Sequence, residues 1–222
     1  MPTGLKAVRP IAMAEILAAR ERIAGTAVRT PLIRLELGPG YPDIRLKLEN
    51  LQPINAYKLR GAANAVALLS AAERERGVWT ISAGNAGQGV AYSARKAGVP
   101  CTVVVIETAP ASKIERMRAL GATLIPVPYE VAWQTLEERT FPGIEGTFVH
   151  PFDDHDFIAG HATIGLEILE GRSIEPADRK GSEPVAVVSR GLATYLWPAE
   201  RAPGKCLFIG SGSTGSVVAQ EG

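Results

Sequence analysis

The fold of this chain is decided by residues 78–106, which read VWTISAGNAGQGVAYSARKAGVPCTVVVI. A short apolar strand is expected over 78–82, and a glycine-punctuated turn leads from it into a helix expected over 85–97. Residues 101–106 form a continuous apolar and largely β-branched run, which is typical of a strand buried on both faces of a parallel sheet. A strand, a helix and a second strand in this order predict a parallel βαβ unit with a right-handed crossover.

The same alternation continues on both sides of this unit and predicts an α/β protein. Further strands are expected over 44–48, 123–127, 147–149, 185–188 and 206–209. Further helices are expected over 10–24, 55–69 (with Asn55 as N-cap), 113–120, 130–139 and 158–169. Ligands of such sheets bind beyond the carboxyl ends of the strands, which here are followed by Ser82–Gly89, Glu107–Pro110, His150–Asp154 and Ser189–Gly191.

Composition excludes several classes of function. The 222 residues carry 24 Lys+Arg and 23 Asp+Glu, and a net charge of +1 argues against a nucleic-acid-binding face. The apolar runs are much shorter than the roughly 20 residues of a membrane helix, and the charged N-terminal stretch does not resemble a signal peptide. Two cysteines and three histidines offer neither a disulfide framework nor a metal site, so no metal is expected and the predicted location is cytoplasmic.

Lys58 is the first candidate for chemistry, because it lies in the first turn of the helix expected over 55–69. The positive end of the helix dipole, together with burial, lowers the pKa of an amine and makes it a better nucleophile. A lysine at such a position is more often an ordinary surface residue, so its role depends on its neighbours.

The turn over residues 82–89 is the second candidate. Its small residues allow backbone N–H groups to converge on an anion at the start of a helix, and Asn85 can both donate and accept hydrogen bonds. An ordinary glycine-rich βα turn with an asparagine cap explains the pattern equally well. The turn is not GxGxxG, so dinucleotide binding has little support.

Short motifs spread over about residues 1–170 carry a family resemblance. In chain order they are LENLQP (48–53), YKLRGA (57–62), SAGN (82–85), QGVA (88–91), ETAP (107–110), RALGA (118–122), HPFDD (150–154), AG (159–160) and TIGLE (163–167). In these motifs the chain resembles the serine/threonine dehydratase family of pyridoxal-phosphate (PLP) enzymes. The resemblance implies PLP fold type II, with parallel sheets and flanking helices. It also implies a small lobe over 51–149, nested in an incomplete large lobe formed by 1–50 and 150–222.

The resemblance also implies roles for individual residues. Lys58 would form the Schiff base with PLP and later remove the substrate Cα proton, and Tyr57, usually Phe in the family, would pack near the cofactor ring. Asn85 would bond to the ring hydroxyl. The N–H groups of the substrate-binding turn would hold the substrate carboxylate; this turn comprises Ser82, Ala83, Gly84, Asn85 and Ala86. Related racemases carry a second serine in the turn, and Ala83 at that position favours dehydration over racemisation.

Three further residues near these motifs depart from the family pattern. Ala56 stands where serine is usual and removes a hydroxyl that can contact the phosphate, and Ala86 replaces a usual histidine. Both changes trim polar groups near the site and are expected to alter substrate preference. His161 stands where glutamine is common, and a capping or partly buried histidine is a more frequent explanation than a catalytic one.

The expected phosphate-binding loop is the largest departure. Ser189, Arg190 and Gly191 follow the strand expected over 185–188, where the family has a tetraglycine loop, and only Gly191 keeps a glycine. Arg190 would then pair with the phosphate directly. A second candidate is GSGSTG at 210–215, for which a polar segment without an ordered role is an equally good explanation.

The predicted activity is PLP-dependent β-elimination of a hydroxy amino acid such as L-threonine or L-serine, giving a 2-oxo acid and ammonia. A first alternative is a C-terminally truncated chain of this fold that has lost catalysis and acts as a binding partner. A second alternative is a dehydratase for another hydroxy amino acid, of the phenylserine or hydroxyectoine-pathway type. The expected partners are a small amino-acid substrate and a second copy in a homodimer, with no nucleic acid and no membrane.

Overall fold

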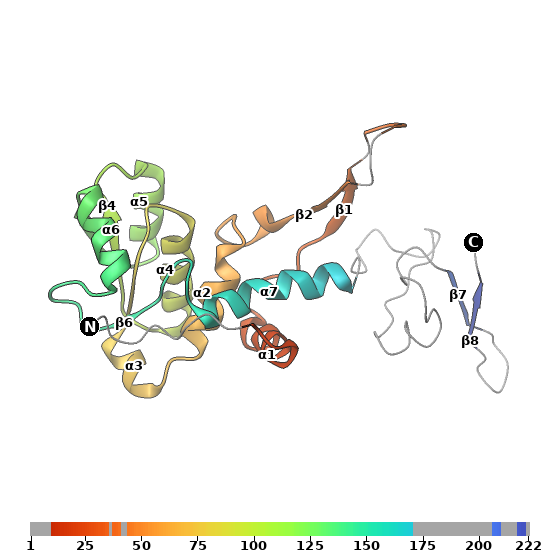
Figure 1. The fold of residues 1–222 in the computed structure, drawn as a ribbon, viewed down its shortest axis with the longest axis horizontal. Helices are drawn as coiled ribbons and strands as arrows, with labels where there is room; N and C mark the ends of the chain where they lie inside the picture. Colours follow the sequence, from red (N-terminus) through yellow and green to blue (C-terminus); the bar gives the residue numbers. More distant parts are fainter. Residues whose placement is uncertain (1–9, 36, 41–43, 171–205, 210–216, 221–222) are drawn as a thin grey trace. The chain divides into compact units, whose positions relative to one another are not determined.

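The computed structural model describes residues 10–35, 37–40, 44–170, 206–209 and 217–220 (Figure 1). The helices are α1 (Met13–Ile23), α2 (Lys58–Ala67), α3 (Ala71–Arg76), α4 (Asn85–Ala97), α5 (Ala111–Ala119), α6 (Tyr129–Glu138) and α7 (His155–Leu169), with a 3-10 turn η1 (Glu49–Leu51). The strands are β1 (Leu32–Leu35), β2 (Ile44–Lys47), β3 (Val78–Ile81), β4 (Cys101–Ile106), β5 (Thr123–Val127), β6 (Thr147–Phe148), β7 (Cys206–Ile209) and β8 (Val217–Gln220). The chain divides into two compact units, one of residues 1–30 and 49–164 and the other of residues 31–48 and 165–222.

A four-stranded parallel sheet organises the first unit. Its strand order is β5-β4-β3-β6, and β3 pairs with β4 from Val78 opposite Cys101 to Ile81 opposite Val104. The predicted α/β architecture with a parallel sheet is therefore confirmed. Helices α4 and α5 are the crossovers of β3-α4-β4 and β4-α5-β5, as the alternation in the sequence predicts.

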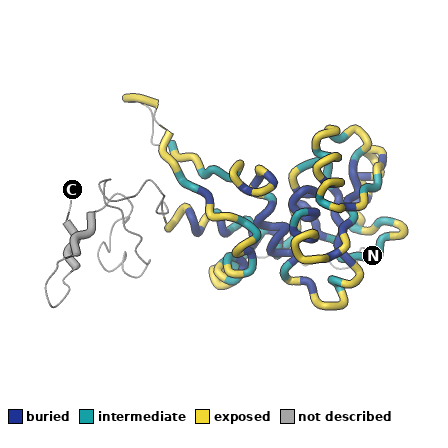
Figure 2. The backbone as a smooth tube through the Cα atoms, turned by 180° about the vertical axis from the view of Figure 1, so that it is seen from behind, coloured by how far each residue is buried: buried dark blue, intermediate teal, exposed yellow. Residues whose placement is uncertain are grey.

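Apolar side chains cover both faces of this sheet, which explains why its central strands are continuously apolar. On one face Val103 and Val105 pack in a cluster with side chains of α2, α4 and α5. On the other face Trp79 and Val104 pack with Ala132 of α6, and partly buried apolar side chains from several elements pack against this cluster. Figure 2 shows the result as dark-blue buried backbone enclosed by exposed helices and loops.

The second unit has antiparallel pairing. Strands β1 and β2 form a ladder from Leu32 opposite Lys47 to Leu35 opposite Ile44, and β7 pairs with β8. Lys47 Nζ donates to Glu167 Oε2 at 2.5 Å, and this ion pair is almost completely buried. The strand expected over 185–188 lies outside the described residues. Within the described part of the chain, no helix is long and apolar enough to cross a membrane.

Asn55 is not the N-cap of α2, and that prediction is wrong. Its φ of +57° places it in the left-handed region, which asparagine tolerates better than most residues, so the helix begins only at Lys58. The Asn55 side chain instead donates to the Asn50 carbonyl and accepts from Arg116, which stabilises the turn before the helix.

Candidate functional site

Lys58 is the first residue of α2 and its side chain is partly buried among aromatic rings. Its Nζ donates to the Pro151 carbonyl at 2.9 Å. The same Nζ lies 5.3 Å from the ring centre of Tyr57, 4.9 Å from that of Phe152 and 5.4 Å from that of Phe157. Burial lowers the pKa of the Lys58 amine, because desolvation disfavours its charged form. This lysine therefore differs from an ordinary surface lysine.

His150 positions the backbone segment whose Pro151 carbonyl accepts the hydrogen bond from Lys58. Its Nδ1 accepts hydrogen bonds from the N–H groups of Phe152 at 3.1 Å and Asp153 at 2.8 Å, which folds the segment around Pro151 into a tight turn. Burial, and then the nearby Arg139 charge, lowers the pKa of His150 to about 4, against a raising effect from Asp153. The ring is therefore neutral near pH 7 and remains an acceptor.

The turn after β3 places the predicted substrate-binding residues at the N-terminus of α4. The Ser82 N–H donates to the Val104 carbonyl, and Ser82 Oγ accepts from the Gly84 N–H at 3.1 Å. A Cβ added at Gly84 would meet no atom within 4 Å, so the approach to this backbone is open. The exposed Asn85 accepts from Lys113 Nζ through Oδ1 at 2.8 Å.

Gly89 allows α4 to lie close against the start of α2. A Cβ there would come within 3.1 Å of the Lys58 carbonyl oxygen and 3.2 Å of Ala62 Cβ, closer than side chains normally pack. The helix that begins at the Ser82–Ala86 turn therefore packs against the helix that begins at Lys58. This packing of α4 against α2 brings the start of the helix that carries Lys58 close to the helix that follows the turn.

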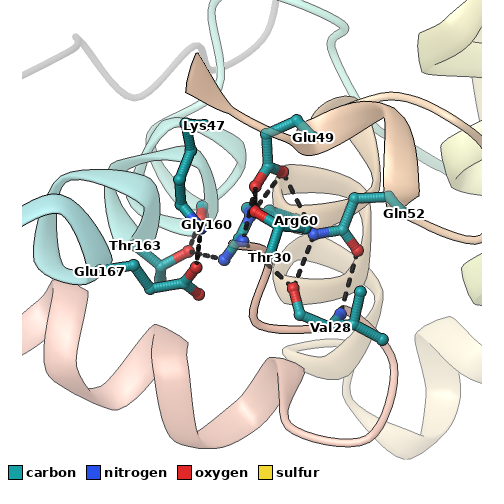
Figure 3. A network of polar contacts seen from close by, with 9 residues as sticks. All are labelled: Val28, Thr30, Lys47, Glu49, Gln52, Arg60, Gly160, Thr163 and Glu167. Carbon is teal, nitrogen blue, oxygen red and sulfur yellow. Dashed lines mark hydrogen bonds and ion pairs between the residues drawn. The ribbon is translucent and has the colours of Figure 1, made fainter. Parts of the chain in front are cut away.

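Behind Lys58, α2 is anchored by a polar network around Arg60 (Figure 3). The guanidinium is 1% exposed and donates twice to Glu49, from Nε and Nη2, each at 2.8 Å. The guanidinium also donates hydrogen bonds to Thr163 Oγ1 and to the Val28 carbonyl, each at 3.2 Å. Burial raises the pKa of Glu49, but the hydrogen bonds and charge of Arg60, with help from Thr30 and Gln52, hold it below its usual value.

Gln52 completes this network with a pair of backbone contacts. Its amide exchanges hydrogen bonds with Val28, donating to the carbonyl at 2.7 Å and accepting from the N–H at 3.0 Å. The network includes Glu49, Gln52, Arg60 and Thr163, which belong to three of the motifs quoted above. The motifs mark these residues, but only the fold shows that they form one network.

Two glycines let α7 cross α2 at backbone distance. A Cβ at Gly160 would lie 2.4 Å from the Arg60 carbonyl oxygen, and a Cβ at Gly61 would lie 2.3 Å from His161 Cε1. The crossing places His161 beside the aromatic rings around Lys58, with its ring centre 4.9 Å from that of Tyr57 and 4.7 Å from that of Phe157.

The predicted phosphate-binding residues lie beyond the part of the chain that the structure describes. Ser189, Arg190 and Gly191, the expected phosphate contacts, lie outside the described residues, as does the alternative loop at 210–215. Tyr57 and Lys58 lie together. Of the predicted substrate-binding residues, Ser82, Ala83 and Gly84 form the turn before α4, and Asn85 and Ala86 are the first two residues of that helix. Sequence reasoning assigned no role to Pro151 or Phe157, although the HPFDD motif marked the loop that contains the first of them.

A scan of protein families matches residues 23–194 to the pyridoxal-phosphate-dependent enzymes. The L-threonine ammonia-lyase of Thermotoga maritima is 48% identical over 134 residues, which are 58% of this chain and 32% of that protein. The biosynthetic L-threonine dehydratase of Bacillus subtilis is 33% identical over 197 residues, 84% of this chain and 46% of that protein. This chain thus spans less than half the length of either relative.

Solved structures include similar folds. The crystal structure of serine racemase from Dictyostelium discoideum superposes with a TM-score of 0.64 at 33% identity. The superposition covers 72% of this chain and 53% of the racemase chain. The fold is thus similar to that of PLP fold type II enzymes, as expected.

Proposed function

Because the chain belongs to the family of pyridoxal-phosphate-dependent enzymes, we propose that its Lys58 site catalyses β-elimination from a hydroxy amino acid. L-threonine and L-serine are the substrates proposed first, and the products are a 2-oxo acid and ammonia. The observation that carries the proposal is the Lys58 amine itself, which is half-buried, surrounded by rings and bonded to a neutral carbonyl. Within the described residues, no carboxylate forms an ion pair with it.

The residues present fit the cofactor. A primary amine with a lowered pKa can attach covalently to its aldehyde, and the rings of Tyr57, Phe152 and Phe157 offer apolar surface beside that amine. The open backbone at Gly84 leaves room for a ligand next to Asn85. Tyr57 and Asn85 are proposed to hold the cofactor ring, and Ser189, Arg190 and Gly191 its phosphate. When bound, PLP supplies an electron sink for the charge that develops at the substrate Cα.

The protein's own contribution starts with the protonation state of Lys58. A lowered pKa increases the fraction of neutral amine near pH 7, and neutral amine is the form that attacks a carbonyl and accepts a proton. The Pro151 carbonyl orients this amine, and the surrounding rings reduce its exposure to water. Backbone N–H groups of the turn from Ser82 to Ala86 are proposed to bind the substrate carboxylate, aided by the N-terminus of α4.

Racemisation is the main competing reaction, since a serine racemase has a similar fold. It requires an acid or base on each face of the substrate Cα. Ala83 has no hydroxyl at the position where related racemases carry serine, and this supports elimination instead. The usual serine and histidine are likewise replaced at Ala56 and Ala86, which leaves a larger hydroxy amino acid as a second candidate substrate.

Cofactor binding tests the proposal first. The purified chain is mixed with PLP and its visible absorption is compared with that of Lys58→Arg, which keeps the charge but has no primary amine. Lys96→Arg, at an exposed position of α4, is the matched control. A visible band in the parent and in Lys96→Arg, and none in Lys58→Arg, is the expected result. A folded parent without a band would overturn the proposal and favour a non-catalytic binding partner.

Product analysis then tests the reaction. Threonine, serine and phenylserine are supplied in turn, and both the 2-oxo acid and any D-amino acid are measured. Elimination predicts 2-oxo acid with little D-isomer, whereas a predominance of D-isomer would replace this proposal with racemisation. The homodimer and the cytoplasmic location stay predictions.

A further inference from the structure

His161 has one ring nitrogen bonded and one without a partner. Its Nδ1 lies 2.7 Å from the Phe157 carbonyl oxygen, which can only accept, so Nδ1 carries the hydrogen and Nε2 carries the lone pair. Nε2 is buried and has no hydrogen-bond partner among the residues that the structure describes. A buried acceptor in this state is rare in native proteins, because it loses water without gaining a donor.

The fold also fixes where this ring lies. The absence of a side chain at Gly61 makes the space that the ring occupies, and the Phe157 bond sets its orientation. The ring contacts Tyr57 and Phe157, the same two rings that lie near Lys58 Nζ. His161 and the Lys58 amine therefore lie beside the same two aromatic rings.

Burial, reinforced by nearby positive charges, keeps His161 neutral. Burial lowers its pKa to about 4, and the positive charges of Lys58 and Arg60 add to this, against raising effects from the Phe157 carbonyl and Glu49. Near pH 7 the imidazole can therefore accept a hydrogen bond at Nε2 but not donate one there. The Lys58 ammonium has three N–H donors, and one of them goes to Pro151.

We propose that His161 is a positioning residue for Lys58, with Nε2 as a second hydrogen-bond acceptor for the flexible lysine amine. The amine alternates between the Pro151 carbonyl and the imidazole, and so has two hydrogen-bonded orientations among the surrounding rings. The inference deepens the proposed function, because that function depends on the same amine.

The test measures Lys58 in the chain without cofactor, so its outcome is independent of catalysis. The pH dependence of reductive methylation at Lys58 is followed by mass spectrometry in the parent, His161→Phe and His161→Gln. Phenylalanine removes the acceptor, whereas the glutamine amide oxygen restores one. His155→Gln is the matched control, since His155 is also a histidine of α7 and bonds to Glu15 rather than lying beside the rings around Lys58.

His161→Phe removes a hydrogen-bond acceptor for the charged Lys58 amine, and this lowers the pKa of Lys58. Near neutral pH, methylation of Lys58 is therefore expected to be about two- to tenfold faster in this variant than in the parent. His161→Gln and His155→Gln are expected to match the parent. An unchanged profile in folded His161→Phe would overturn the inference.

A second measurement does not depend on the folding of His161→Phe. The ¹⁵N resonance of His161 Nε2 is recorded in the parent and in Lys58→Met, which removes the donor. A shift between the two is expected, and identical resonances would contradict the assigned contact. If the methylation profile and the ¹⁵N resonance change as expected while the PLP band is absent, only the proposed function is contradicted.

Discussion

At the scale of single residues, Arg60 shows how a buried charge is stabilised beside a reactive lysine. Its guanidinium is almost completely buried, and Glu49 provides two short charge-assisted hydrogen bonds. Removing one partner of such a pair leaves the other charge desolvated without compensation, which typically costs about 3–5 kcal/mol.

Glu49→Gln is therefore expected to lower the free energy of unfolding by about 3 kcal/mol or more, measured by urea denaturation. The control is the double variant Glu49→Leu with Arg60→Met, which removes both charges. The stability lost by this double variant is expected to be smaller than the sum of the losses of the single variants Glu49→Leu and Arg60→Met. Additive losses would show that the pair is not coupled.

Lys58 and the Ser82–Ala86 turn could be predicted from the sequence, because a lysine in a first helical turn and a glycine-rich βα turn are local patterns. The Arg60 network could not be predicted, because Arg60 and Thr163 are 103 residues apart and their contact depends on how α7 crosses α2. His161 shows the same limit. Its departure from the family pattern was visible, but its buried Nε2 was not.

At the scale of elements, the crossing of α2 and α7 depends on glycine at one position of α7 and not at another. A Cβ at Gly160 would lie 2.4 Å from the Arg60 carbonyl oxygen, whereas a Cβ at Gly165 would meet no atom within 4 Å. The two sites thus form a matched pair on one helix.

Gly160→Ala is expected to lower the free energy of unfolding by about 2 kcal/mol or more, because backbone atoms must move apart. Gly165→Ala is expected to be neutral or to stabilise by up to about 1 kcal/mol, through higher helix propensity. Thermal unfolding of both variants checks this. Equal effects would mean that the crossing tolerates a side chain.

Most helices and strands of the first unit followed from periodicity, but its α3 was not predicted, and neither was β1 of the second unit. Helix α3 is short and has no buried residue, so it leaves no apolar stripe, although Ser70 and Glu73 form a capping box that could have marked its start. Strand β1 is short and mostly exposed, and its pairing with β2 is what makes it a strand.

At the scale of the whole molecule, two histidines that are neutral in the folded chain make its stability depend on pH. His150 and His161 have pKa values lowered from 6.5 to about 4 in the folded chain. Between these values the unfolded chain binds protons that the folded chain does not, so their contribution is complete above about pH 6.5 and falls toward pH 4. The lowered pKa of Glu49 adds a further loss as pH falls through its folded value.

The free energy of unfolding is therefore expected to be lower at pH 5 than at pH 7.5, measured by urea denaturation at a series of pH values. His150→Asn keeps an acceptor for the N–H groups of Phe152 and Asp153 but does not titrate, so its stability should fall less steeply over the same range. Equal stability of the parent at pH 5 and pH 7.5 would contradict this assignment.

The contact between Lys58 and Pro151 has a consequence for how the protein is made. The two residues are 93 positions apart, and the anchor behind Lys58 needs Thr163 as well. A ribosome adds roughly 5–20 residues per second, so α2 leaves the exit tunnel several seconds before its partners do. During that interval Lys58 is an exposed, hydrated lysine with ordinary reactivity. The order of translation thus delays the activation of this amine until the segment that buries it has been synthesised.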